Sequence, residues 1–198
     1  MAKRQILTFP DARLREVSEP VSSVTPEMKT LVKDMLDTMY AAKGIGLAAI
    51  QVGEPIRLLV IDTRPLPSEK TKESEDQEDP MTDLEKKVTQ PLVIFNPEII
   101  EGRGSVTYDE GCLSVPTYYE TVERYQWIKA KGLDIDGKEF FLETDGLLAI
   151  CLQHEMDHLD GKLFIDRISF VRSQKIKNQI KKHGYGEKPV KKKEESAL

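Results

Sequence analysis

Two histidines and a glutamate in the second half of the chain are spaced to hold a metal ion. His154, Glu155 and His158 form the pattern H-E-x-x-H inside residues 147–158, where we expect a helix. Residues four apart lie on one helix face at about 6 Å, so both imidazoles can bind one metal and Glu155 can act as general base on its water. The alternative is two partly buried histidines on an amphipathic helix. The metal site is favoured because the chain has only three histidines and this motif uses two of them.

A catalytic metal site of this kind needs a third protein ligand. Phe164 occupies the position at which metzincin proteases carry a third histidine, and a phenyl ring cannot bind a metal. Cys151 precedes His158 by seven residues, or about 10 Å of helix rise, so we expect it to be a buried, small apolar side chain. Cys112 comes from another segment and can approach the helix from the side, although a cysteine taken alone is more often a core thiol. A mixed thiolate and imidazole set favours iron, zinc, nickel or cobalt over magnesium or calcium.

The composition indicates one soluble domain. A chain of 198 residues is long enough for a real core, and its net charge of −5 argues against a protein coated in nucleic acid. No apolar run reaches the roughly 18–20 residues of a membrane helix, and residues 1–10 do not resemble a secretory signal. We therefore expect a cytoplasmic protein without membrane contact, in which two cysteines are free thiols or metal ligands rather than a disulfide.

Hydrophobic periodicity and turn residues predict an α+β fold in which short antiparallel β-sheets pack around a central metal-binding helix, with a further helix at the C-terminus. Asp136-Gly137 is typical of a hairpin turn, and Thr144 and Asp145 can cap the central helix. The helices are expected at 23–40, 147–158 and 169–182, and the strands at 57–63, 92–95, 104–108, 118–125, 128–133 and 138–144.

The chain divides into two parts by composition. Residues 1–168 are expected to form the catalytic domain, interrupted at 65–90 by an acidic stretch that has almost no large apolar side chains. Such a stretch cannot bury enough surface to offset its ordering entropy, so we expect it to be exposed and mobile. Residues 169–198 are expected to form a basic helix with a narrow apolar stripe and then, from Gly184 onwards, a disordered tail.

Three stretches resemble the three motifs of the peptide deformylase family, in the family's order. They are Gly-Ile-Gly-Leu-Ala-Ala-Ile-Gln at 44–51, Glu-Gly-Cys-Leu-Ser at 110–114 and Gln-His-Glu-Met-Asp-His-Leu-Asp-Gly at 153–161. The segment at 9–15 is also similar to the family's N-terminal segment, so the resemblance covers about residues 4–182. The acidic stretch at 65–90 departs from the compact bacterial members, which affects the surface and oligomerisation rather than the chemistry.

The resemblance implies an enzyme of protein biosynthesis that hydrolyses the formyl group from formyl-methionyl nascent polypeptides. The products are formate and a free N-terminal methionine. By the same resemblance, one divalent metal per chain is bound by Cys112, His154 and His158. The metal is Fe²⁺ in the cell, whereas purified protein can hold Zn²⁺, Ni²⁺ or Co²⁺.

The family also implies roles for the residues around the metal. Metal-bound water is the nucleophile, and Glu155 is the general acid and base. The side-chain amide of Gln51 and the backbone N–H of Leu113 stabilise the developing oxyanion. Glu110 and Gln153, at the edges of two motifs, are expected to orient the ligands.

Substrate binding is expected around the first motif and the central helix. An extended substrate can pair like a strand with Gly44, Ile45 and Gly46, because bare backbone allows its close approach. The glycines can equally mark a helix end. Leu147 and Ile150 can line a pocket for the methionine side chain, but they fit an ordinary core as well.

Two other functions are compatible with parts of the sequence. The first is an H-E-x-x-H zinc peptidase, which Phe164 and the placement of Cys112 argue against. The second is a non-catalytic, metal-stabilised protein whose basic C-terminal helix binds the ribosome; retention of Glu155 and Gln51 argues against it, because a purely structural site needs neither. Ribosome docking through that helix is also compatible with an active enzyme, since its basic face can meet RNA, and a solvated basic face is the alternative.

Overall fold

The computed structural model describes residues 3–64 and 81–185 of the chain. Its elements in chain order are α1 (Pro26–Ala41), β1 (Gly46–Ala48), β2 (Leu58–Ile61), β3 (Leu92–Arg103), β4 (Val106–Cys112), β5 (Val115–Arg124), β6 (Trp127–Leu133), β7 (Glu139–Asp145), α2 (Gly146–Leu159) and α3 (Phe170–His183). Short 3-10 helices lie at Ala12–Arg15, Ala49–Val52, Glu85–Lys87 and Phe164–Asp166.

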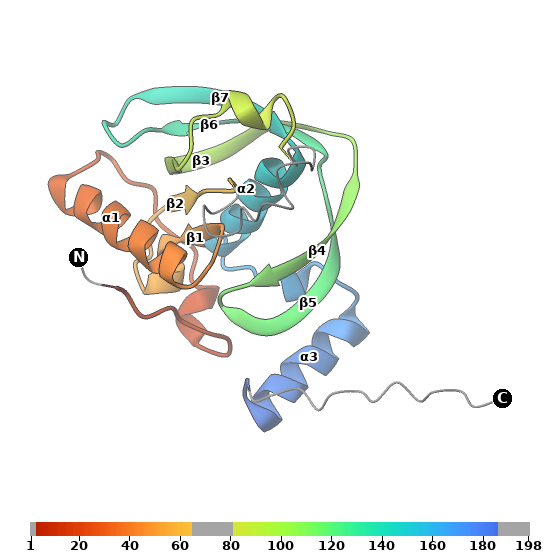
Figure 1. Ribbon diagram of the computed structural model, residues 1–198. Helices are drawn as coiled ribbons and strands as arrows, with labels where there is room; N and C mark the ends of the chain where they lie inside the picture. Colours follow the sequence, from red (N-terminus) through yellow and green to blue (C-terminus); the bar gives the residue numbers. More distant parts are fainter. Residues whose placement is uncertain (1–2, 65–80, 186–198) are drawn as a thin grey trace, which may run out of the picture.

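The strands form two antiparallel sheets on either side of α2. Five strands pair in the order β1-β2-β3-β6-β7, and β4 and β5 form a separate hairpin. Figure 1 shows α2 in the middle of the molecule, with β3, β6 and β7 above it, β1 and β2 to its left, the hairpin to its right and below it, and α1 on the outside. The predicted α+β architecture around a central helix is thereby confirmed.

Helix α2 is central because it is apolar on most of its circumference, and such a helix is stable only when it is covered on all sides. Leu148, Leu152 and Leu159 are fully buried and share one core cluster with Ile94 of β3 and Ile128 of β6. Eleven of the residues in α2 are buried, including both histidines of the motif. The metal-binding pattern therefore lies inside the protein, where surrounding groups can fix each side chain.

The N-terminus of α2 is capped by a residue from the acidic stretch. Asp145 is the N-cap residue but makes no side-chain capping bond, whereas Oε1 of Glu85 accepts the Leu148 N–H at 2.7 Å. Glu85 is only 1% exposed, and Gly146 at φ +59° makes room for its carboxylate. The prediction of an exposed segment over 65–90 is thus wrong for Glu85 and Gln90, which are buried, whereas Asp83, Lys86 and Lys87 are exposed. Glu85 is buried because a carboxylate at a helix N-terminus satisfies orphan N–H donors. Residues 65–80 of that prediction lie outside the described residues.

We expect Glu85→Ala to lower the free energy of unfolding by about 1–3 kcal/mol, because it leaves a buried helix N–H without its acceptor. Urea denaturation followed by circular dichroism measures this change. Asp83→Ala is the matched control, since Asp83 is an exposed acidic residue of the same loop and its loss should change the stability little. Equal effects of the two substitutions would contradict the capping role.

Several strand ends differ from those predicted. Strand β3 continues past Phe95 to Arg103, and its pairing with β6 shifts register after Phe95. Asn96 has a positive φ of 49° and Pro97 lacks an N–H. The run of apolar residues that predicted this strand therefore ends at Phe95, although the strand itself continues. Strand β1 was not predicted, because its three residues are all buried and show no alternation. The turn at Gly137, with φ of 77°, is as predicted.

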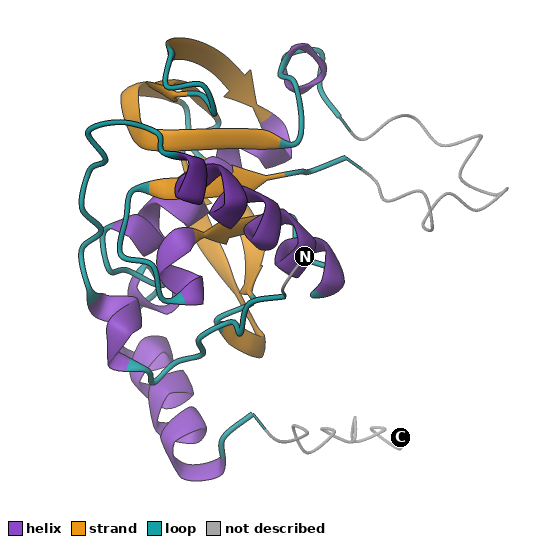
Figure 2. Cartoon of the chain, turned by 90° about the vertical axis from the view of Figure 1, so that its left-hand side faces the viewer, coloured by secondary structure: helices purple, strands orange, loops and turns teal. Residues whose placement is uncertain are grey.

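Helix α3 lies at one end of the molecule, away from the five-stranded sheet (Figure 2). It packs on the body through Ile176 and Ile180, as its narrow apolar stripe indicates. Tyr185, just after the helix, is half-buried and its hydroxyl donates to the Phe9 carbonyl at 2.7 Å. The predicted disorder from Gly184 onwards is therefore wrong for Tyr185, and residues 186–198 lie outside the described residues. Within the described ranges, no helix is long and apolar enough to cross a membrane.

Candidate metal centre and active site

Cys112, His154 and His158 come together at the contact between the β4–β5 hairpin and α2. One ligand atom from each lies within 4.8 Å of the others, and Sγ of Cys112 is 3.2 Å from Nε2 of His158. The two imidazole centroids are 5.0 Å apart with the rings steeply inclined. One sulfur and two nitrogens at these separations fit a single divalent transition metal.

The surroundings orient the ring of His154 and keep His158 neutral. Nδ1 of His154 is 2.8 Å from a carboxylate oxygen of Glu110, so this nitrogen carries the proton and Nε2 is left for a metal. His158 is 1% exposed, and burial lowers its pKa well below the ordinary value. It is therefore a neutral imidazole, the form that can bind a metal.

A buried ion network fixes Glu110 and connects the hairpin to α2. The Arg124 guanidinium on β5 donates to both oxygens of Glu110, at 2.6 and 2.9 Å, and to Asp157 of α2 at 2.6 Å. All three side chains are at most 6% exposed. Arg167, which is partly exposed, also pairs with Asp157. Bidentate charge-assisted bonds of this type fix both partners in orientation, so Arg124 sets the position of the carboxylate that orients His154.

Gln51 and Glu155 lie on the other side of the ligand set. Oε1 of Gln51 accepts the Ala48 N–H at 2.7 Å, and its Nε2 donates to Oγ of Ser114 at 3.0 Å and lies 3.8 Å from Sγ of Cys112. Glu155 is 4% exposed, and its Oε2 is buried with no hydrogen-bond partner among the described residues. A buried carboxylate oxygen without a partner is costly, and its position beside the metal ligands marks it as a functional group.

The two buried glutamates of the site have different protonation behaviour. Although burial opposes ionisation, the Arg124 guanidinium and His154 lower the pKa of Glu110 to about 2. Burial raises the pKa of Glu155 to about 7. Two carboxyl groups with pKa values pushed apart by their surroundings indicate two roles: Glu110 stays ionised and orients, and Glu155 can exchange a proton near neutral pH.

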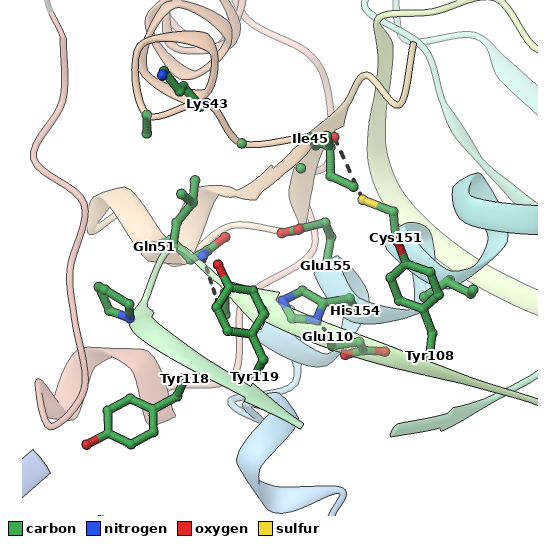
Figure 3. A pocket seen from close by; sticks show the side chains of 18 of the residues that line it. Lys43, Ile45, Gln51, Tyr108, Glu110, Tyr118, Tyr119, Cys151, His154 and Glu155 are labelled. Carbon is green, nitrogen blue, oxygen red and sulfur yellow. Dashed lines mark hydrogen bonds and ion pairs between the residues drawn. The ribbon is translucent and has the colours of Figure 1, made fainter. Parts of the chain in front are cut away.

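A cavity of about 530 Å³ opens onto this cluster. Leu147 and Ile150 of α2 line it, together with Ile45 and Leu113, so the predicted pocket residues do face one space. Figure 3 shows Glu155, His154 and Gln51 within this cavity. The combination of an apolar wall and a few convergent polar groups is typical of a ligand site.

Gly44 and Gly46 pack closely against side chains at the cavity wall. A Cβ atom on Gly46 would lie 2.4 Å from Oε1 of Glu155, and one on Gly44 would lie 2.6 Å from Cδ1 of Leu113. The alternative that the glycines mark a helix end is confirmed for Gly44, whose N–H donates to the Met39 carbonyl of α1 at 2.9 Å. It is wrong for Gly46, which begins β1.

Sequence reasoning misplaced one site residue and missed others. The side chain of Gln153 binds the backbone N–H and carbonyl of Tyr125, so it anchors α2 to the hairpin and does not orient a ligand. The partners Arg124 and Asp157 of the ion network were not predicted. Asp157 lies within the H-E-x-x-H motif, and a carboxylate on a helix that is expected to be central needs a cationic partner, which is the signal that could have revealed the network.

Fold and site together define an α+β protein with a Cys–His–His metal centre beside a buried glutamate. The model of the polypeptide deformylase family matches residues 3–174 of the chain. The peptide deformylase of Tolumonas auensis is 45% identical over 182 residues, covering 92% of this chain and 96% of that protein. The peptide deformylase of Saccharophagus degradans is 46% identical over 183 residues, covering 92% and 94%.

Solved structures agree with these relatives. The crystal structure of peptide deformylase from Ehrlichia chaffeensis has a TM-score of 0.79 at 36% identity and covers 94% of this chain and 99% of that chain. A structure of the enzyme from that organism in complex with actinonin has a TM-score of 0.77 at 39% identity, covering 92% and 98%. The chain belongs to the polypeptide deformylase family, and it is therefore a hydrolase that acts on formylated nascent peptides.

We expect Cys112→Ser to weaken metal binding by more than about tenfold, because a hydroxyl replaces the thiolate ligand. Metal content after dialysis against a weak chelator measures the change. Cys151→Ser is the matched control, since the other thiol of the chain is buried against the Ile45 carbonyl and should not affect metal retention. Full retention of metal by Cys112→Ser would rule out this ligand set.

Proposed function

We propose that this chain removes the formyl group from formyl-methionyl peptides by hydrolysis at the Cys112, His154 and His158 centre. The observation that supports this most strongly is the meeting of these three ligand atoms with the buried Glu155 in one apolar cavity. Bound there, a divalent metal, Fe²⁺ in the cell, supplies positive charge that acidifies water and polarises the formyl oxygen.

Glu155 provides the proton transfers. Its pKa of about 7 allows the ionised form to take a proton from the attacking water and the protonated form to deliver that proton to the departing amine. Glu155 is enclosed by protein, since the residue is 4% exposed. Exclusion of bulk water strengthens each of these electrostatic interactions.

Gln51 and Leu113 stabilise the oxygen of the formyl group as negative charge develops on it. The Gln51 amide is already fixed by its bond to the Ala48 N–H, and its Nε2 points to the side of Cys112. Leu113 follows Cys112 directly, so its backbone N–H belongs to the same loop. Each donor that is held in place before the reaction stabilises the transition state by a few kcal/mol, which corresponds to a factor of about 10²–10³ in kcat.

The substrate is oriented by the cavity wall. Its methionine side chain occupies the apolar space beside Leu147 and Ile150, and its backbone extends along Gly44, Ile45 and Gly46. Strand β1 lies at the edge of the five-stranded sheet, so it can accept an added peptide strand. A zinc peptidase is not favoured, because the proposed ligand set includes Cys112 and the relatives of this chain are named as peptide deformylases.

We further propose that the reaction takes place in the cytoplasm with α3 docked on the ribosome. The exposed face of α3 is basic through Arg172, Lys175, Lys181 and Lys182, which suits contact with phosphates. Replacing Lys175, Lys181 and Lys182 by Glu should weaken cosedimentation with ribosomes by at least about tenfold and leave tripeptide turnover intact. Unchanged cosedimentation would show that this basic face is only solvated.

We expect Glu155→Ala to lower kcat for formate release from a formyl-Met tripeptide by about 10²–10⁴, with the metal retained. The protein should be purified anaerobically, because iron and thiolate both react with oxygen. Glu139→Ala, which removes an exposed carboxylate, is the control and should keep full activity. Turnover by Glu155→Ala at the unmodified rate, or internal cleavage of a longer peptide by the native chain, would contradict the proposal.

A further inference from the structure

We propose that Tyr119 selects the second residue of the substrate and favours aromatic and large apolar side chains there. This inference rests on the proposed function and adds to it a specificity-determining residue at the rim of the cavity. Tyr119 lies on β5 and lines the cavity together with Ile45 and Tyr108 (Figure 3). It is 68% exposed, and the other two are 41% and 44% exposed, so the rim presents large apolar surfaces to solvent.

The ring of Tyr119 crosses from its own strand onto β4. Gly111 is the cross-strand partner of Tyr119 in the hairpin, and a Cβ atom on Gly111 would lie 2.5 Å from Cε1 of the tyrosine ring. The ring therefore occupies the space of the missing Gly111 side chain, a packing in which an aromatic residue covers a strand glycine. It reaches towards the outer edge of β4 as a result.

That edge is available to an extended peptide. In the described part of the chain, β4 pairs only with β5, so its other edge has no strand partner. Gly111 of β4 lines the same cavity as Ile45 and Gly46, where β1 begins. A peptide strand inserted between the two would continue both sheets. Its formyl end must lie at Cys112, so the chain runs away from the metal along β4.

Alternation of side chains then places the second residue. Glu110 faces α2, where it contacts His154, so the inner face of β4 holds Glu110 and the outer face holds Gly111. The methionine of the substrate points inward into the pocket, and the next residue must therefore point to the outer face. The outer position nearest the metal is that of Gly111, which Tyr119 covers.

The expected change in kcat/KM corresponds to the free energy of one aromatic contact. A phenylalanine at the second position should have a kcat/KM about three- to tenfold higher than a glycine at that position. We would measure formate release from formyl-Met-Phe-Ser and formyl-Met-Gly-Ser with the full metal-loaded chain. Tyr119→Ala should bring the ratio of the two kcat/KM values close to one, mainly by raising KM for the phenylalanine peptide.

Tyr125→Ala is the matched control. Tyr125 directly follows β5 and is half exposed. A Cβ atom on Gly102 would lie 2.5 Å from its ring, but Tyr125 is not among the residues that line the cavity of the metal centre. The control variant removes a ring over a strand glycine and should leave the peptide ratio unchanged. A ratio lowered equally by both substitutions would attribute the effect to loss of packing and overturn the assignment.

A charged variant keeps the test decisive if Tyr119→Ala folds poorly. Tyr119→Lys retains a long side chain at the rim and should reverse the preference towards a peptide with aspartate at the second position. Retention of the phenylalanine preference by either variant would overturn the proposal. Absence of formate release from both peptides with the native chain would instead refute the proposed function.

Discussion

The Arg124 guanidinium joins the two parts of the molecule that carry the metal ligands. It binds Glu110 on the strand that ends in Cys112, and it binds Asp157 on the helix that carries both histidines. Because these charges are buried, removal of any one of them would leave the others uncompensated at a cost of about 3–5 kcal/mol. The distance between the thiolate and the imidazoles is thus fixed by a charge balance as well as by apolar packing.

This constraint explains how the catalytic groups divide their tasks. Arg124 keeps Glu110 ionised, so Glu110 fixes the ring of His154 and leaves Glu155 as the carboxyl group that can exchange protons. Close packing of Gly46 against Glu155 then brings the edge of the five-stranded sheet to the reaction centre. The hairpin brings a second strand edge without a strand partner among the described residues, and in the proposed binding mode the substrate lies between the two edges.

Local patterns were enough to predict α1, α2, most strands and the pair of histidines, because helix periodicity and the H-E-x-x-H spacing are properties of short segments. Cys112 was expected beside them from the resemblance to the family, and its sulfur lies next to both histidines. The features that were mispredicted depend on contacts between distant segments. Glu85 caps α2 across 63 residues of sequence, and Tyr185 binds the Phe9 carbonyl across 176. The Arg124 network also depends on contacts that local patterns do not predict. Glu110 and Arg124 are not cross-strand partners, and no periodicity of the sequence relates them.

X-ray absorption spectroscopy at the metal edge of the anaerobically purified protein would show whether the thiolate and both imidazoles bind the metal. We expect one sulfur scatterer at about 2.3 Å and two imidazole nitrogens at about 2.0–2.1 Å for the zinc form, which would correspond to Cys112, His154 and His158. A first shell made only of nitrogen and oxygen would contradict it. In that case the thiolate would not be a ligand, and the hairpin would not be part of the metal centre.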